Sequence, residues 1–209
     1  MDKFYSQVLE NQVLFFIGSE DMVASVPSTE DEEVVCLWSE FSQAEKALKK
    51  ALDEGDWEGY SVVEIPLDEA LNYLLPTMED SDLLIGLNWP PTLKGEELSC
   101  EEVILNLEKA IDDDAGRKLQ GHLQESHPVW VIADPEHPDS FVHLAARSAA
   151  EGALAVWTDQ TAAQHALAEG GWQGLELKCV SAQDFAALAR GKVLAIDWSE
   201  GGLTPEFQM

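Results

Sequence analysis

Apolar and polar positions along the first half of the chain follow two different periods. Short apolar runs closed by Gly, Pro or acidic turns are typical of strands, whereas apolar residues three and four positions apart are typical of helices. The pattern predicts, in order, helix 2–10, strands 13–18, 22–26 and 34–38, helix 39–54, strand 60–64, helix 66–75, strand 83–88 and a helix that begins at 99.

Residues with strong end preferences mark where these helices begin and end. Ser39 is a predicted N-cap, and Gly55 lies just beyond the end of the same helix. Ser99 and Glu102 have the spacing of a capping box at the start of the last helix. Pro76 is expected to end the helix that precedes strand 83–88, because proline lacks the backbone donor that a helix interior needs.

The second half of the chain repeats this order in a shorter form. Its pattern predicts strands 129–133, 141–144 and 154–157, helix 158–168, strand 175–180, helix 182–188 and strand 193–198. No later segment matches the helix that begins at 99, so we expect the tail 200–209 to be partly mobile.

An aromatic framework occurs twice in the sequence. Leu37-Trp38-Ser39 returns as Val156-Trp157-Thr158, Gly55-Asp56-Trp57-Glu58-Gly59 as Gly170-Gly171-Trp172-Gln173-Gly174, and Asn88-Trp89 as Asp197-Trp198. The offset between the copies shrinks along the chain, which places insertions between elements, where they are tolerated. The sequence therefore predicts an α+β fold of two tandem repeats, each a mixed, mostly antiparallel sheet with helices packed on it.

The run Asp112–Asp114 suggests where one repeat ends. Carboxylates at a helix C-terminus oppose the helix dipole, so either the helix from 99 ends there or the acidic run opens another helix, 115–124. We therefore expect a first, acidic repeat over 1–114, a connecting helix over 115–126 and a second, shorter repeat over 127–209.

The charge of the chain is strongly negative and uneven. The net charge is −28; residues 1–116 carry 28 Asp and Glu against six Lys and Arg, and residues 117–209 carry 12 against six. Such a field repels phosphate backbones and anionic lipid, which argues against nucleic acid and membrane as partners, and it attracts basic proteins. The alternative explanation of the negative charge is that it only keeps the protein soluble.

The lack of a recognisable targeting segment and the pattern of cysteines predict a cytoplasmic protein. The N-terminus lacks the basic region and apolar core of a signal peptide, and no apolar run is long enough to span a membrane. The three cysteines are widely spaced; Cys36 and Cys179 lie in apolar, strand-like runs where a reduced thiol acts as a small hydrophobic side chain. The sequence predicts no disulfide framework.

The spacing of the candidate catalytic and metal-binding residues does not match known motifs. The five histidines lack the helical spacing of a zinc motif, and the acidic runs Glu30–Glu33 and Asp112–Asp114 lack the pattern of a calcium loop. Ser39 and Thr158 stand where a strand meets a helix, but capping explains them better than nucleophilic catalysis. We predict no catalytic residues, no cofactor and no metal.

The tryptophans in the repeated glycine-flanked turns are candidates for a binding surface. Trp57 is bordered by Glu54, Asp56 and Glu58, a combination that favours a cationic partner, and Trp172 holds the corresponding place in the second repeat. The alternative is that each turn tryptophan folds back over its own helix.

The first repeat resembles the uncharacterised bacterial family called domain of unknown function 2750. The resemblance covers about residues 5–110, and 127–199 resembles the same pattern more loosely; the second copy is also similar to the N-terminal domain of SseB-type proteins. It rests on Leu37-Trp38, Ser42–Glu45, Trp57-Glu58-Gly59-Tyr60, Leu67-Asp68-Glu69, Leu75-Pro76 and Leu83–Trp89 followed by Pro90. The resemblance implies no assigned enzyme.

Two functional hypotheses of different classes follow. The first is a non-enzymatic bacterial protein that binds or regulates a basic protein, an immunity-type inhibitor being one specific form. The second is a small-ligand-binding protein or enzyme with a pocket between the two repeats. A homodimer formed through a sheet edge is a third alternative.

Overall fold

The computed structural model describes residues 3–19, 22–28, 32–137, 139–200 and 202–209. Contacts divide the chain into two compact units, residues 1–110 (unit 1) and 111–209 (unit 2). The predicted turn at Glu20–Asp21 and the acidic pair Glu30–Asp31 lie outside the described residues. The finer division at residues 114 and 126 stays a prediction.

Unit 1 is built on a mixed sheet. In chain order it contains α1 (Lys3–Asn11), β1 (Val13–Gly18), β2 (Ser25–Pro27), β3 (Glu33–Leu37), α2 (Phe41–Glu54), β4 (Ser61–Pro66), α3 (Leu67–Glu69), the π-helical segment η1 (Ala70–Leu74), α4 (Leu75–Glu79), β5 (Leu84–Leu87), β6 (Glu97–Ser99) and the start of α5 (Cys100–Gln124). Four strands have the order β2-β3-β5-β6, with β3 and β5 parallel. β4 pairs with β1, which reaches β3 through the bridge Phe15↔Trp38.

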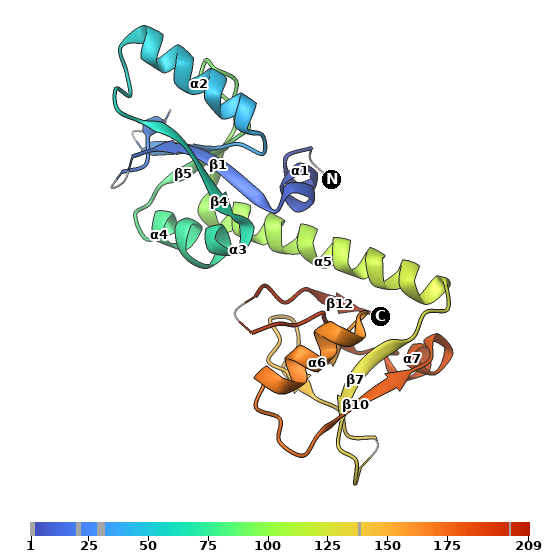
Figure 1. The fold of residues 1–209 in the computed structure, drawn as a ribbon. Coiled ribbons are helices and arrows are strands. Elements are labelled where there is room, and N and C mark those ends of the chain that lie inside the picture. The colour runs from blue at the N-terminus through green and yellow to red at the C-terminus, as the bar shows by residue number, and fades with distance from the viewer. Residues whose placement is uncertain (1–2, 20–21, 29–31, 138, 201) are drawn as a thin grey trace. The chain divides into compact units, whose positions relative to one another are not determined.

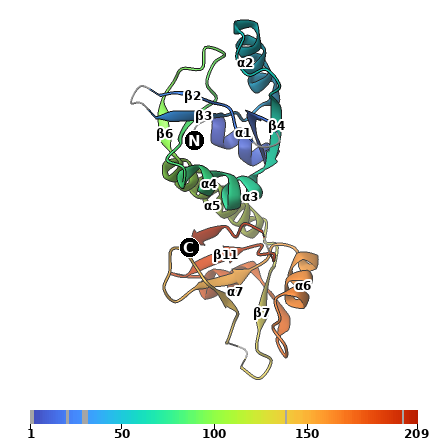
Figure 2. The same cartoon turned by 90° about the vertical axis from the view of Figure 1, so that its left-hand side faces the viewer.

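Helices cover both sides of the unit 1 strands. α2 lies on one side, and α3 and α4 lie on the other (Figures 1 and 2). α2 turns its small residues Ala44, Ala47 and Ala51 inward, which allows the helix to approach the sheet closely. Trp38 is fully buried in the core beneath it, and removing so large a buried side chain would cost about 3–5 kcal/mol.

Unit 2 repeats this topology. After the end of α5 it contains β7 (Val129–Ala133), β8 (His143–Leu144), β9 (Ala153–Val156), α6 (Gln160–Glu169), β10 (Glu176–Val180), α7 (Ala182–Leu188), β11 (Val193–Ile196) and β12 (Glu206–Gln208). β8, β9, β11 and β12 correspond to β2, β3, β5 and β6, and β9 and β11 are parallel. β10 pairs with β7, and the bridge Trp130↔Trp157 matches that of unit 1. The predicted α+β fold of two tandem repeats is confirmed.

The two copies also share a hydrogen bond between the indole of one tryptophan and the backbone carbonyl of another. The indole of Trp38 donates to the carbonyl of Trp89 at 2.9 Å, and the indole of Trp157 donates to the carbonyl of Trp198 at 2.9 Å. The repeated tryptophans thus tie the end of one parallel strand to the end of its neighbour.

Ser39 and Thr158 also bond to the end of the neighbouring parallel strand, so their prediction as N-caps is wrong. The backbone N–H of Ser39 donates to Asn88 Oδ1 at 2.9 Å, and that of Thr158 donates to Asp197 Oδ1 at 2.7 Å. Glu40 and Asp159 occupy the N-cap positions instead. We call each pair, Ser39 with Asn88 and Thr158 with Asp197, a strand-end clasp.

Two predicted helix ends are confirmed. Gly55 has φ 90°, and the N–H of Asp56 donates to the carbonyl of Ala51 at 2.9 Å, which closes α2. At the start of α5 the N–H of Glu102 donates to Ser99 Oγ and the N–H of Ser99 donates to Glu102 Oε2, both at 3.1 Å. These reciprocal bonds form the expected capping box.

Two other helix predictions are wrong. α5 runs without a break over Cys100–Gln124, because Asp114 is paired with Arg117 (3.1 Å) and Lys118 (2.8 Å) on the next turn and so stabilises a helix interior. Pro76 does not end its helix either. It lies in α4 directly after η1, where the wider π-helical turn accommodates a residue without a donor.

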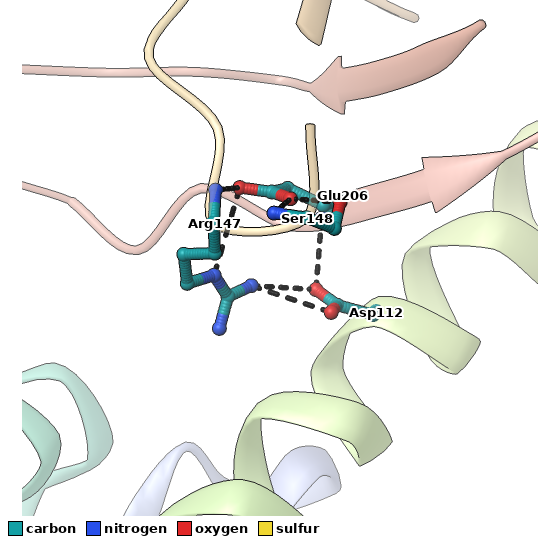
Figure 3. A network of polar contacts seen from close by, with 4 residues as sticks. All are labelled: Asp112, Arg147, Ser148 and Glu206. Carbon is teal, nitrogen blue, oxygen red and sulfur yellow. Dashed lines mark hydrogen bonds and ion pairs between the residues drawn. The ribbon is translucent and has the colours of Figure 1, made fainter. Parts of the chain in front are cut away.

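The tail of unit 2 contains a strand where we expected mobility. β12 pairs antiparallel with β11, and the Glu206 carboxylate accepts hydrogen bonds from the N–H groups of Arg147 (2.6 Å) and Ser148 (3.0 Å) and from the Ser148 hydroxyl (2.6 Å) (Figure 3). The N–H of Glu206 donates to Asp112 Oδ1 at 2.8 Å, and the Arg147 guanidinium lies 3.0 Å from the same oxygen. These bonds hold β12 to α5 and to the loop after β8.

Burial and hydrogen bonding shift the two carboxylates of this network in opposite directions. Burial raises the pKa of Asp112, and the bonds from Glu206 and Arg147 offset this only in part. Burial also acts to raise the pKa of Glu206, but the donors from Ser148 and Arg147 outweigh it and lower the pKa below its usual value. Glu206 is therefore held as an anion.

Candidate partner surface

The C-terminal end of α2 and the turn after it hold four of the five residues predicted to form a partner surface. Glu54, Asp56 and Glu58 are exposed, as is the neighbouring Asp53. Lys50 forms an ion pair with Glu54 one turn back along the helix. We call Asp53, Glu54, Asp56 and Glu58 the acidic end of α2.

The carboxylates of the acidic end interact unfavourably with the dipole of α2. The last carbonyl groups of a helix carry partial negative charge, so each exposed carboxylate beside them costs roughly 0.3–1 kcal/mol. No acidic residue lies in the first turn of α2, where a carboxylate would be favourable. Apart from the ion pair between Lys50 and Glu54, the acidic end therefore does not serve the stability of α2.

Trp57 packs largely against its own unit. It is half-buried and contacts the core cluster that contains Trp38 and Trp89. Its backbone has φ 57°, an unusual value for a bulky residue, and the N–H of Tyr60 donates to its carbonyl at 3.1 Å. The Trp57 ring is thus packed against the core and only partly exposed.

Trp172 lies in the corresponding turn of unit 2 and is also half-buried. Its ring centroid is 6.3 Å from that of Trp157 and 5.2 Å from that of Trp198. Gly171 and Gln173 stand where unit 1 has Asp56 and Glu58, and of the carboxylates around Trp57 only Glu54 has a counterpart, Glu169. The structure brings Glu54, Asp56, Trp57 and Glu58 together in one turn, whereas Trp172 belongs to another.

An exposed apolar flank on α2 was not predicted from the sequence. Phe41 shares the helical spacing of the buried alanines, but it is 49% exposed, and Leu52 is 45% exposed. Phe41, Leu48 and Leu52 fall within about 40° of one another around the helix axis, at about 100° per residue. Their spacing could have shown that they form a flank beside the alanine face rather than its centre. We call these three residues the α2 flank.

Several polar side chains of the described residues form local contacts outside this surface. Within the described ranges, no three His, Cys, Asp or Glu side chains converge as metal ligands. His137 Nδ1 lies 2.9 Å from Asp134 Oδ2, a bond that lowers the pKa of Asp134. The rings of His122 and His127 lie 5.0 Å apart at the end of α5. Each contact has a local structural explanation.

One open pocket in unit 2 has a volume of about 580 Å³. It lies at the end of the strands and is lined by His143, Glu151, Lys192 and Gln208 among others. His143 Nδ1 lies 3.0 Å from the carbonyl of Phe141. Side chains of both charge signs line it, so it selects no ligand class by charge.

The cysteines differ in accessibility. Cys36 is buried, which raises its pKa to about 12, and burial raises the pKa of Cys100 to about 11. Cys179 lies in β10, as its apolar surroundings predicted, but it is exposed. The two buried thiols are therefore held protonated and unreactive.

Among the described helices, none is long and apolar enough to cross a membrane.

Comparisons with known proteins give one clear match. The profile of the family described as "Protein of unknown function (DUF2750)" matches residues 1–107, and no curated protein matches the chain. The solved structure of Anabaena Tic22 (protein transport) is 13% identical, covers 88% of this chain and 84% of its own, and has a TM-score of 0.29. Tic22 from Plasmodium falciparum is 12% identical with coverages of 86% and 83% and a TM-score of 0.30. At TM-scores this low, neither likeness identifies the fold or the function of this chain.

Proposed function

Since the chain belongs to the DUF2750 family of proteins of unknown function, we propose, from the geometry of its surface, that it is a protein-binding module. In this proposal the acidic end of α2 contacts a basic partner protein, and the chain regulates that partner without catalysing a reaction. Inhibition of a cationic toxin, as by an immunity protein, is the most specific form of the proposal.

One observation carries the proposal: the acidic end of α2 lies next to the exposed α2 flank, whereas the same place in unit 2 keeps only Glu169, in the position of Glu54, and Leu167, in the position of Leu48. Asp56 and Glu58 correspond to Gly171 and Gln173, and Phe41 corresponds to Gln160. Both units nevertheless build the same sheet. The fold therefore does not require these side chains, and binding offers a reason for them.

The shared hydrogen bonds support a further part of the proposal, that unit 2 is a diverged second copy of the family's domain. Both copies keep the buried tryptophans Trp38 and Trp157 and the strand-end clasps. What differs is the exposed surface around α2 and α6. In this view unit 2 preserves the architecture, and unit 1 carries the partner surface.

The experiment that tests the proposal is a pull-down from native lysate at about 50 mM and about 500 mM salt, because exposed charge attraction is largely screened at the higher concentration. The variant D53N/D56N/E58Q removes three carboxylates of the acidic end. A matched control, E79Q/D80N/D82N, removes three exposed carboxylates that also lie at a helix C-terminus, that of α4.

We expect a basic protein that is retained by wild type and control at low salt and lost at high salt. Each exposed ion pair contributes roughly 0.2–1 kcal/mol, so the triple variant should bind about 3-fold to about 100-fold more weakly. Equal retention by D53N/D56N/E58Q and by the control would show that the acidic end of α2 is not the contact.

A further inference from the structure

The α2 flank is an elongated apolar strip at the edge of the helix. Phe41 and Leu52 are separated by 11 residues, about 16 Å along a helix at about 1.5 Å per residue, and the partly buried Leu48 lies between them. The ring of Phe41 rests edge-on against Phe15, with centroids 5.9 Å apart and planes at 81°. This contact fixes one end of the strip while leaving half of the Phe41 surface exposed.

Unit 2 shows that the strip is not a packing requirement. α6 buries Ala163 and Ala166 against its sheet, as α2 buries Ala44 and Ala47. Leu48 is matched by Leu167, but the residue of α6 that corresponds to Phe41 is Gln160. α6 ends at Glu169, so it has no helical counterpart of Leu52.

Charges of both signs surround this strip on α2. Glu45 lies beside it, about 40° from Phe41 around the axis, and the acidic end lies at its C-terminal limit. Lys49 lies on the same side beyond Glu45, about 80° from Phe41, and Lys46 and Lys50 lie farther round, at about 140° and 180°. An occupant of the strip would therefore meet Glu45 first along that side and several carboxylates at the C-terminal end.

Charge also selects the kind of occupant. A second copy of this chain carries the same net charge of −28, so two acidic ends would repel each other. A basic segment would be attracted. A helix three turns long with one apolar face matches a straight, narrow apolar strip better than an extended segment, whose side chains alternate in direction.

We infer that the α2 flank docks an amphipathic helix of a basic partner, with the apolar face of that helix on Phe41, Leu48 and Leu52 and its Lys or Arg residues beside Glu45 and the acidic end. This inference rests on the proposed function and adds the shape of the partner's contact element. Apolar burial supplies part of the affinity, in addition to the charge attraction that salt screens.

The test uses a labelled Leu/Lys peptide of about 15 residues, with leucines at helical i, i+3, i+4 and i+7 spacing, and a scrambled peptide of the same composition. Fluorescence anisotropy measures binding of both peptides to the full chain. The variant F41S/L52S removes the two exposed ends of the flank. The control M22S/Y73S removes two other exposed apolar side chains, 60% and 70% exposed.

We expect the amphipathic peptide to bind more tightly than the scrambled one, and F41S/L52S to weaken it about 10-fold to 30-fold, as burial of two partly exposed apolar side chains implies. M22S/Y73S should change it less than about 2-fold.

Two contrary results separate the inference from the proposed function. If both peptides bind equally, F41S/L52S has no effect and D53N/D56N/E58Q abolishes binding, the docked helix is refuted and an acidic partner surface stands. If D53N/D56N/E58Q leaves the binding of both peptides unchanged, the inference and the proposed function both fail.

Discussion

The strand-end clasp of unit 1 should make Asn88 a key residue for stability. Ser39 is fully buried, and its N–H donates to Asn88 Oδ1. In the variant N88A this N–H loses its acceptor, which costs about 1–3 kcal/mol for a buried donor. Asn88 also has φ 50°, a left-handed conformation that costs alanine about 1–2 kcal/mol. The Ser39 hydroxyl still reaches Gln7 Oε1 at 2.9 Å, so it adds no further loss, and we expect a total of about 2–5 kcal/mol.

Two further variants separate these contributions. N88G removes the amide but adopts positive φ freely, so it should cost about 1 kcal/mol less than N88A. N88D keeps an acceptor for the Ser39 N–H, and the serine hydroxyl can donate to its second oxygen, as Thr158 donates to Asp197 Oδ2 at 2.8 Å. We therefore expect N88D to cost less than about 1 kcal/mol.

The assay combines urea unfolding, followed by tryptophan fluorescence, with amide hydrogen exchange at Ser39. Because the two units can unfold in separate transitions, the exchange rate assigns the loss to unit 1. D197A provides the comparison in unit 2, where Asp197 is exposed and also has φ 50°; the left-handed cost of about 1–2 kcal/mol remains, and the loss from the hydrogen bonds should be smaller than in unit 1. An N88D variant as unstable as N88A, or an N88A variant within about 0.5 kcal/mol of wild type, would refute the reasoning.

Three other predictions concern buried or constrained positions. A Cβ at Gly116 would meet the ring of Phe207 in β12 at 2.2 Å, whereas a Cβ at Gly121 of the same helix would meet nothing within 4 Å. Thermal unfolding should therefore show that G116A is destabilised by about 1–3 kcal/mol and that G121A is stabilised by up to about 1 kcal/mol. The pKa of Glu206 is lowered from 4.5 in the folded state, so its stabilisation is present above that value and is lost as the pH falls below it. Unfolding at neutral and acidic pH should therefore show E206Q less stable than wild type near neutrality, with the difference shrinking in acid. Thiol labelling of the native protein should modify Cys179 and not Cys36, and labelling of Cys36 should require unfolding.

The order of elements could be predicted because local patterns dictate it. β1 occupies the predicted residues Val13–Gly18, and α7 the predicted residues Ala182–Leu188, since both combine a clear period with a distinct beginning and end. β6 and β12 were missed because strands of three residues are too short to display a period. Their positions depend on pairing with β5 and β11.

The roles of individual side chains were harder to predict when the partner lies far along the chain. Asn88 is 49 residues from Ser39. The residues next to Ser39 in the sequence therefore indicate only a capping role and do not reveal the clasp. The continuity of α5 could have been predicted, because Asp114 has Arg117 and Lys118 three and four residues ahead. The error came from weighing the helix dipole above these local pairs.

The candidate partner surface was predictable in its charges and less so in its apolar part. The carboxylates around Trp57 are evident in the sequence and are exposed in the structure, whereas burial of the Trp57 ring depends on the core around Trp38. The exposure of Phe41 depends on how α2 is rotated on its sheet. Helical spacing alone identifies an apolar side without stating how much of it the sheet covers.

Hydrogen exchange across the chain, measured alone and with the basic protein retained in the low-salt pull-down, tests the central claim most directly. The account predicts slower exchange in residues 41–60, which span α2 and the turn after it, and unchanged exchange in residues 160–175, the corresponding part of unit 2. Protection of residues 160–175 or of the α4 end at 79–82, with residues 41–60 unaffected, would contradict the claim that the acidic end of α2 is the partner surface.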